Sequence, residues 1–112
     1  MLYYDFEAGN KQYKLRINTR SVVQLEKVLG CNPLGIFGDG ETLPTITVMV
    51  TVLHAALQQY HHGITLNDAF DIFDKYLEDG NNATDFVTVI LEVYKVSGLI
   101  PKVDAEAETE KN

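Results

Sequence analysis

The chain has 112 residues, a mass of 12.6 kDa and a formal net charge of −7. This length suits one domain with a modest core, and 46% hydrophobic residues with six Tyr and five Phe predict a folded protein, not a disordered one. The negative charge argues against binding to nucleic acid or to an anionic membrane surface, because both depend on Lys and Arg.

Cysteine content and hydropathy indicate in which cellular compartment the protein is found. The single cysteine, Cys31, excludes an intramolecular disulfide and fits a reducing cytosol. No basic stretch followed by a long apolar stretch opens the chain, and no apolar run approaches the roughly 20 residues needed to cross a bilayer. These features predict a soluble protein of the cell interior.

The N-terminal segment predicts a β-hairpin. Residues 2–7 and 12–17 partly alternate apolar with polar side chains, and Gly9-Asn10 between them is a turn signal. Alternation places Tyr13, Leu15 and Ile17 on one face. Two strands alone are marginally stable, so this face is expected to pack on the helices that follow.

A first helix is predicted from Thr19, as its N-cap, to about Leu29. Gly30 is expected to end it in the left-handed conformation. Val22 and Leu25 share its inner face with Leu29.

A turn and a loop follow this helix. Asn32-Pro33 is typical of a cap with proline at the first helical position, and it predicts a short turn through Phe37. Residues 38–41 predict a loop, which Leu43-Pro44 closes.

The segment of about residues 45–60 predicts a helix with an unusually wide apolar arc. An ordinary surface helix has an apolar stripe somewhat wider than about 100°, and here the arc is roughly twice that. The polar positions recur at intervals of three and four, which favours a helix over a strand. They form one narrow stripe: Thr47, Thr51, His54 and Gln58.

The next helix is plainly amphipathic. Thr65 and Asp68 are spaced as a capping box at its start, and Gly80-Asn81-Asn82 ends it. The residues expected to lie inward are Leu66, Ala69, Phe70, Phe73, Tyr76 and Leu77.

The last helix, about Thr84 to Ser97, repeats the wide apolar arc, and Gly98 and Pro101 end it. Its thin polar stripe consists of Asp85, Thr88, Glu92 and Lys95. The chain from residue 102 onward is acidic and predicts a disordered tail. The expected fold is therefore α+β and mainly α: one domain, residues 1–101, with an N-terminal β-hairpin packed on a bundle of about four helices.

Two helices with wide apolar arcs pose a packing problem in so small a domain. One can be central, and the other is then covered by a second subunit or offers a groove to an apolar client. A compact monomer that covers both helices is the third alternative. For the client, the groove is expected between the helices of residues 45–60 and 84–97. The partner-binding residues of this hypothesis are Val48, Val50, Val52, Val87, Ile90, Leu91 and Tyr94.

The sequence gives little support for a catalytic or metal site. His61-His62 near Asp68 and Asp71 suggests a metal site, but adjacent residues on a helix point about 100° apart, whereas helical zinc motifs place ligands at i and i+4. The preferred interpretation is that the histidines finish a helix. No catalytic motif surrounds Cys31. The sequence therefore predicts a protein that is not an enzyme, with no catalytic, cofactor-binding or metal-binding residues.

Several segments together resemble the tail assembly chaperones of long-tailed phages and prophages of low-GC Gram-positive bacteria. The resemblance spans about Tyr3 to Pro101, and residues 60–65 are its most specific part. The segments that carry it are Tyr13-Lys14-Leu15-Arg16 with Thr19-Arg20, Leu25-Glu26-Lys27 to Leu29-Gly30, Asn32-Pro33-Leu34, Leu53-His54-Ala55 to Tyr60-His61-His62-Gly63-Ile64-Thr65, and Val93 to Lys95-Val96-Ser97-Gly98 with Pro101.

The resemblance implies a non-enzymatic assembly factor of the host cytoplasm. Such proteins hold the long, aggregation-prone tape measure protein in solution, help to recruit tail tube subunits, and are absent from the finished virion. Many are also made as a longer product by translational frameshifting. Two alternatives stay open: a structural head–tail connector or tail terminator of a phage, and a metal-dependent enzyme that uses His61 and His62.

Overall fold

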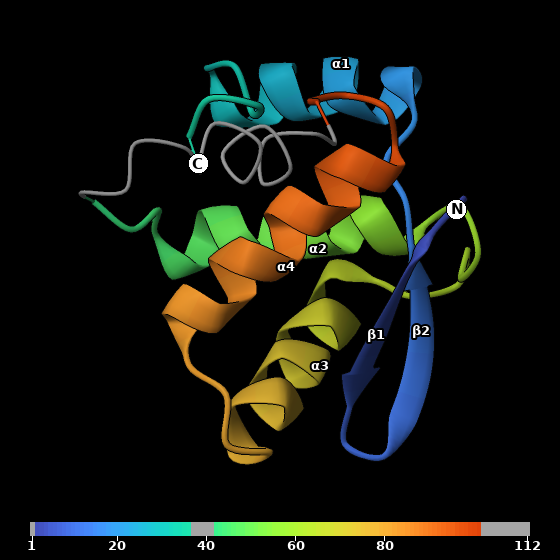
Figure 1. Cartoon of the computed structure of the whole chain (residues 1–112), viewed down its shortest axis with the longest axis vertical. Helices are drawn as coiled ribbons and strands as arrows, with labels where there is room; N and C mark the ends of the chain where they lie inside the picture. Colours follow the sequence, from blue (N-terminus) through green and yellow to red (C-terminus); the bar gives the residue numbers. More distant parts are fainter. Residues whose placement is uncertain (1, 37–41, 102–112) are drawn as a thin grey trace, which may run out of the picture.

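A computed structural model describes residues 2–36 and 42–101. The elements are β1 (Tyr4–Ala8), β2 (Lys11–Leu15), α1 (Thr19–Leu29), α2 (Ile46–Leu57), α3 (Leu66–Glu78) and α4 (Ala83–Val96) (Figure 1). This confirms the expected fold class, an antiparallel hairpin with four helices. The predicted loop at residues 38–41, the end of the turn at Phe37 and the predicted tail lie outside the described residues.

The hairpin closes through the predicted turn. Gly9 and Asn10 both have positive φ, at 59° and 67°, as a tight two-residue hairpin turn requires. Gly9 is also needed for space, because a Cβ there would come within 2.7 Å of the Lys75 Cδ. Leu15 and Ile17 are fully buried, so the predicted inner face of the second strand is confirmed.

Side chains cap the helices at their N-termini. Asn18, not Thr19, is the N-cap of α1, and its Oδ1 accepts a hydrogen bond from the Ser21 amide at 2.9 Å. Thr19 already belongs to the helix, so the predicted cap was wrong by one residue. The predicted stop is confirmed, since Gly30 has a φ of 71°.

Two capping boxes start α3 and α4. Thr65 and Asp68 exchange hydrogen bonds between side chain and backbone at 3.0 and 3.1 Å, as predicted. Asn82 and Asp85 do the same at 2.9 Å in both directions, which the sequence analysis did not identify. Each box satisfies amide groups that the first helical turn leaves without partners.

Helix α2 ends at Leu57, earlier than the predicted end near Tyr60. The Gln58 side-chain amide donates to the carbonyl oxygens of His54 and Ile64, at 3.1 and 2.9 Å. Gln58 thereby ties the helix end to the segment that leads into α3.

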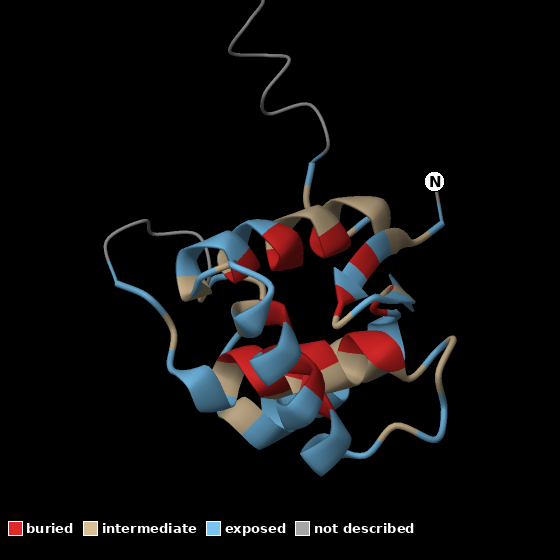
Figure 2. Ribbon diagram, turned by 90° about the horizontal axis from the view of Figure 1, so that it is seen from below, coloured by how far each residue is buried: buried red, intermediate tan, exposed pale blue. Residues whose placement is uncertain are grey.

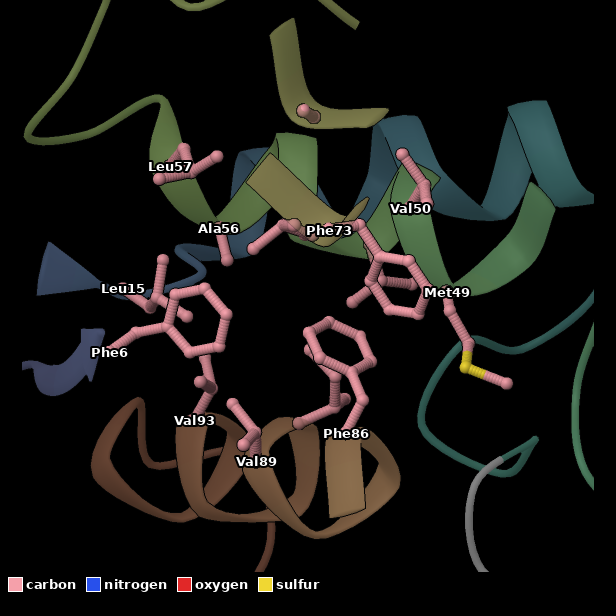
Figure 3. Close-up of a cluster of buried hydrophobic side chains, with 14 of the residues drawn as sticks. Phe6, Leu15, Met49, Val50, Ala56, Leu57, Phe73, Phe86, Val89 and Val93 are labelled. Carbon is pink, nitrogen blue, oxygen red and sulfur yellow. The ribbon is translucent and has the colours of Figure 1, made fainter. Parts of the chain in front are cut away.

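One hydrophobic core unites the hairpin and the helices, with α2 in contact with α1, α3, α4 and β2 (Figure 2). Side chains from β1, α3 and α4 meet at its centre, where the rings of Phe73 and Phe86 lie edge to face at 5.0 Å (Figure 3). The buried residues of the two wide-arc helices are Met49, Val50, Val52, Leu53, Ala56 and Leu57 on α2, and Phe86, Val89, Ile90, Val93 and Tyr94 on α4. Residues of the same chain thus cover most of both arcs.

The inner face of α3 differs from the prediction. Leu66 and Phe70 were expected inward but are 43% and 36% exposed. The buried stripe contains Ala69, Ile72 and Tyr76. Phe70 follows Ala69 directly and therefore points about 100° away from it around the helix.

Candidate partner-binding groove

The predicted groove between α2 and α4 is not an open surface. Val50, Val52, Ile90 and Tyr94 have exposed fractions of 0%. The hypothesis that these four side chains are accessible to a partner is therefore wrong for this fold. Three of the seven predicted residues are half-buried: Val48, Val87 and Leu91.

Tyr94 shows why this side of α4 is covered. Its hydroxyl donates a hydrogen bond to the carbonyl oxygen of Pro33 at 2.8 Å, and Leu34 and Ile36 of the same turn pack on the core. Burial raises the pKa of the Tyr94 hydroxyl well above its usual range. The turn after α1 therefore lies on the surface that the sequence analysis had left open for a client.

An open groove lies instead between α1 and α2. A hollow of about 230 Å³ lies on the surface where the two helices meet. Its lining residues are Ser21, Gln24, Leu25 and Val28 of α1, Thr51, His54 and Ala55 of α2, and Gln58, the C-cap of α2. Three of these, Thr51, His54 and Gln58, belong to the polar stripe of α2, which therefore faces α1 across the groove.

A second hollow, of about 450 Å³, lies at the N-terminal end of α2. It is lined by Gly35, Ile36, Thr42, Leu43, Pro44, Thr45 and Val48. Val48 lines this hollow and Thr51 lines the first one, and because they are three residues apart they are neighbours on one face of α2. We call the lining residues of both hollows together the α1–α2 groove. Val48 is the only predicted partner-binding residue that lines it within the described parts of the chain.

Exposed apolar side chains border this groove. Val28 and Leu43, which line it, are 71% and 49% exposed, and Ile46, which follows the lining residue Thr45 in the chain, is 45% exposed. None of the three was among the predicted partner-binding residues. A partial signal was present in the sequence, because Val28, like Val23, is an apolar residue that lies away from the predicted inner face of Val22, Leu25 and Leu29.

The histidines do not assemble a metal site. His61 accepts a hydrogen bond at Nε2 from the Lys14 amide at 3.0 Å, His62 is exposed, and His54 lies in the α1–α2 groove. Over residues 2–36 and 42–101, no group of three or more His, Cys, Asp or Glu side chains is placed to hold a metal ion. His61 therefore has a structural contact with β2 that the sequence analysis did not anticipate.

The His61 contact depends on a neutral imidazole, since a protonated ring has no acceptor nitrogen. Burial, the Lys14 charge and His62 together lower the pKa of His61 below its ordinary value of 6.5. The ring also lies edge to face with Tyr13, at 5.4 Å between centroids.

Cys31 is exposed and follows the end of α1.

No helix among the described residues is long and apolar enough to span a membrane.

The chain was compared with known proteins. No curated protein and no solved structure matches it. Residues 5–112 match a family described as a family of unknown function (DUF6096), and because the match covers nearly the whole chain, the protein belongs to this family.

Proposed function

We propose that this protein is a phage tail assembly chaperone that binds the tape measure protein and keeps it soluble. The proposal is supported by the resemblance of residues 3–101 to that class and by the α1–α2 groove. The chaperone acts in the host cytoplasm, helps to recruit tail tube subunits, and leaves before the virion is complete.

The α1–α2 groove is the observation that carries the proposal. Its lining side chains are apolar or uncharged polar groups, and one of them, Val28, is 71% exposed. An amphipathic helix can lay its apolar face into such a groove, with anchors spaced at i, i+3, i+4 and i+7. The long helical segments of a tape measure protein are the part whose apolar faces most need shielding from water.

The charge of the protein suits a holding role. With a net charge of −7, copies bound along a client repel one another and keep the loaded complex soluble. The described groove lining contains no Asp, Glu, Lys or Arg, so contact with the client there rests on apolar packing and uncharged hydrogen bonds and not on ion pairs.

The test is co-expression with the tape measure protein encoded beside it, followed by co-purification and a count of bound copies. Val28→Asp is expected to weaken client binding by about 2 kcal/mol or more, about thirtyfold, because it places a charge in an apolar contact. Val23→Asp is the matched control, since Val23 is 47% exposed on the same helix and lines neither hollow.

Three results would contradict the proposal: an insoluble client, equal binding by both variants, or the protein in purified virions. Mass spectrometry of purified particles makes the last measurement, because a head–tail connector or tail terminator stays in the particle.

A further inference from the structure

The outer edge of strand β2 is occupied by other parts of the chain. The Lys14 amide donates to Nε2 of His61 at 3.0 Å, and the Arg16 amide donates to the Ala56 carbonyl oxygen at 3.0 Å. These two bonds use the amide groups that point away from β1. The edge of β2 is thereby tied to the end of α2.

The outer edge of strand β1 has no such partners among the residues that the structure describes. Because the Lys14 amide points away from β1, its register partner Asp5 must also point its amide and carbonyl groups outward. Glu7, two residues on, has the same orientation. Among the residues that the structure describes, none forms a hydrogen bond with the backbone of Asp5 or Glu7 on this side.

A hollow of about 590 Å³ lies along this edge. Four consecutive β1 residues line it, which places the strand edge, and not just one face, at its wall. The lining residues are Tyr4, Asp5, Phe6, Glu7, Asn10, Tyr76, Asp79, Asn81 and Val89. In Figure 1, β1 is the strand on the side of α3 and α4, the helices that supply the opposite wall. The edge therefore faces free space.

The hollow is acidic. Asp5, Glu7 and Asp79 line it, and Asp79 is held there because its Oδ2 accepts the Gly9 amide at 2.8 Å. Lys75, whose stem lies against Gly9, and Lys11 and Lys14, the register partners of Ala8 and Asp5, are the nearby cations, but no Lys or Arg is among the described residues that line the hollow. The rim therefore attracts positive charge.

Two further acids act on the tyrosines of the hollow. Burial, and then the charges of Glu92 and Asp5, raise the pKa of Tyr4. Burial, and then Asp85, raise the pKa of Tyr76 to about 12. The negative field thus extends from the rim toward α4.

We propose that the open edge of β1 binds an extended, basic peptide segment of a partner protein as a third strand. Its backbone pairs with the amide and carbonyl groups of Asp5 and Glu7, and its Lys or Arg side chains meet the acidic rim. A second copy of this chain suits the edge poorly, because pairing β1 with itself brings Asp5 and Glu7 opposite like charges.

This site is independent of the proposed function. The hollow along the β1 edge is lined by residues of β1, α3, α4 and the adjoining turns, whereas the α1–α2 groove is lined by other elements. A result on one surface therefore leaves the other untouched.

The experiment titrates the full chain with an end-capped heptapeptide of alternating lysine and valine. Isothermal titration measures the affinity, and NMR hydrogen exchange follows the Asp5 and Glu7 amides. Two probes are controls: the same peptide with glutamate in place of lysine, and the lysine peptide with N-methylated backbone amides on its pairing side.

The protein variant is Glu7→Pro, which removes one outward amide and one rim carboxylate without touching the ladder between β1 and β2. Glu7→Gln removes the carboxylate and keeps the amide, so comparing it with Glu7→Pro separates the two effects. Gln12→Pro is the matched control, because Gln12 is the register partner of Glu7 and its amide points outward on the other edge. Circular dichroism establishes that both variants remain folded.

We expect the lysine peptide to bind, to protect both amides, and to lose at least about tenfold in affinity with Glu7→Pro but not with Gln12→Pro. The glutamate and N-methylated peptides should bind at least about tenfold more weakly. The inference is overturned by no binding, by equal binding of the N-methylated peptide, which means attraction by charge alone, or by a wild-type dimer paired through β1.

Discussion

At the scale of single residues, His61 has the most informative contact. Its imidazole accepts the outward amide of Lys14 at 3.0 Å and thereby closes one edge of the hairpin. The proton of the neutral ring must then be on Nδ1. The sequence indicated that the His61-His62 pair ends a helix, but the partner of the side chain is 47 residues away in the chain.

His61 should make folding stability depend on pH. Its pKa is lowered in the folded state by burial, Lys14 and His62, so the unfolded chain binds the proton more tightly. The contribution of His61 to folding stability is then fully present above its pKa in the unfolded chain, about 6.5, and decreases as the pH falls through and below that pKa. Urea unfolding between about pH 7.5 and 5 measures this decrease.

His61→Gln is the informative variant for this dependence, because a glutamine oxygen accepts a hydrogen bond but does not titrate in this range. We expect it to flatten the pH dependence, while His62→Gln at the exposed neighbouring position retains most of it. An unchanged slope in His61→Gln would assign the dependence to other groups.

At the scale of elements, the two wide-arc helices are buried by their own chain. Val50 of α2 and Ile90 of α4 have no exposed surface, although both were expected in an accessible groove. The width of an apolar arc predicts how much of a helix is covered. It contains no information on whether the cover is another helix, a turn or a partner.

Charged substitutions at these positions should therefore unfold the protein. Val50→Asp or Ile90→Asp buries an unpaired carboxylate, which is expected to reduce the free energy of unfolding by more than about 4 kcal/mol, a large part of the stability of a small domain. Thermal denaturation followed by circular dichroism measures the loss. Val28→Asp, at a position that is 71% exposed, should unfold near the wild-type temperature. Folded Val50→Asp and Ile90→Asp variants would instead mean that α2 and α4 separate readily.

At the scale of the whole molecule, α2 is the central element and α1 lies at the periphery. Helix α2 contacts three helices and a strand and buries six residues, whereas Leu25 is the single buried residue of α1. One wall of the α1–α2 groove, α2, is therefore anchored in the core by many buried side chains, and the other wall, α1, by few.

Native-state hydrogen exchange should reveal this difference. We expect amides of α2 to exchange only through global unfolding, and those of α1 to exchange at least about tenfold faster, after correction for intrinsic rates, through local opening. The dependence of exchange on low urea concentrations separates the two routes. Equal protection in both helices would show that α1 unfolds together with the core.

The sequence by itself determined the elements and most of their ends. Signals within a few residues of one another, such as the Gly9-Asn10 turn, the Thr65–Asp68 capping box and the Gly30 stop, act locally and were confirmed. The apolar periodicity also predicted four helices and the inner face of β2. Errors were local where the pattern was ambiguous, as at Thr19 and Phe70.

Only the tertiary structure decided which surfaces stay open. It placed the turn of Pro33 over α4, turned the polar stripe of α2 toward α1, and left one edge of β1 without a hydrogen-bond partner within residues 2–36 and 42–101. These outcomes depend on which elements meet across large separations in the chain. A local pattern fixes the face that a helix or strand must bury, but the neighbour that buries it is selected by the packing of the whole chain.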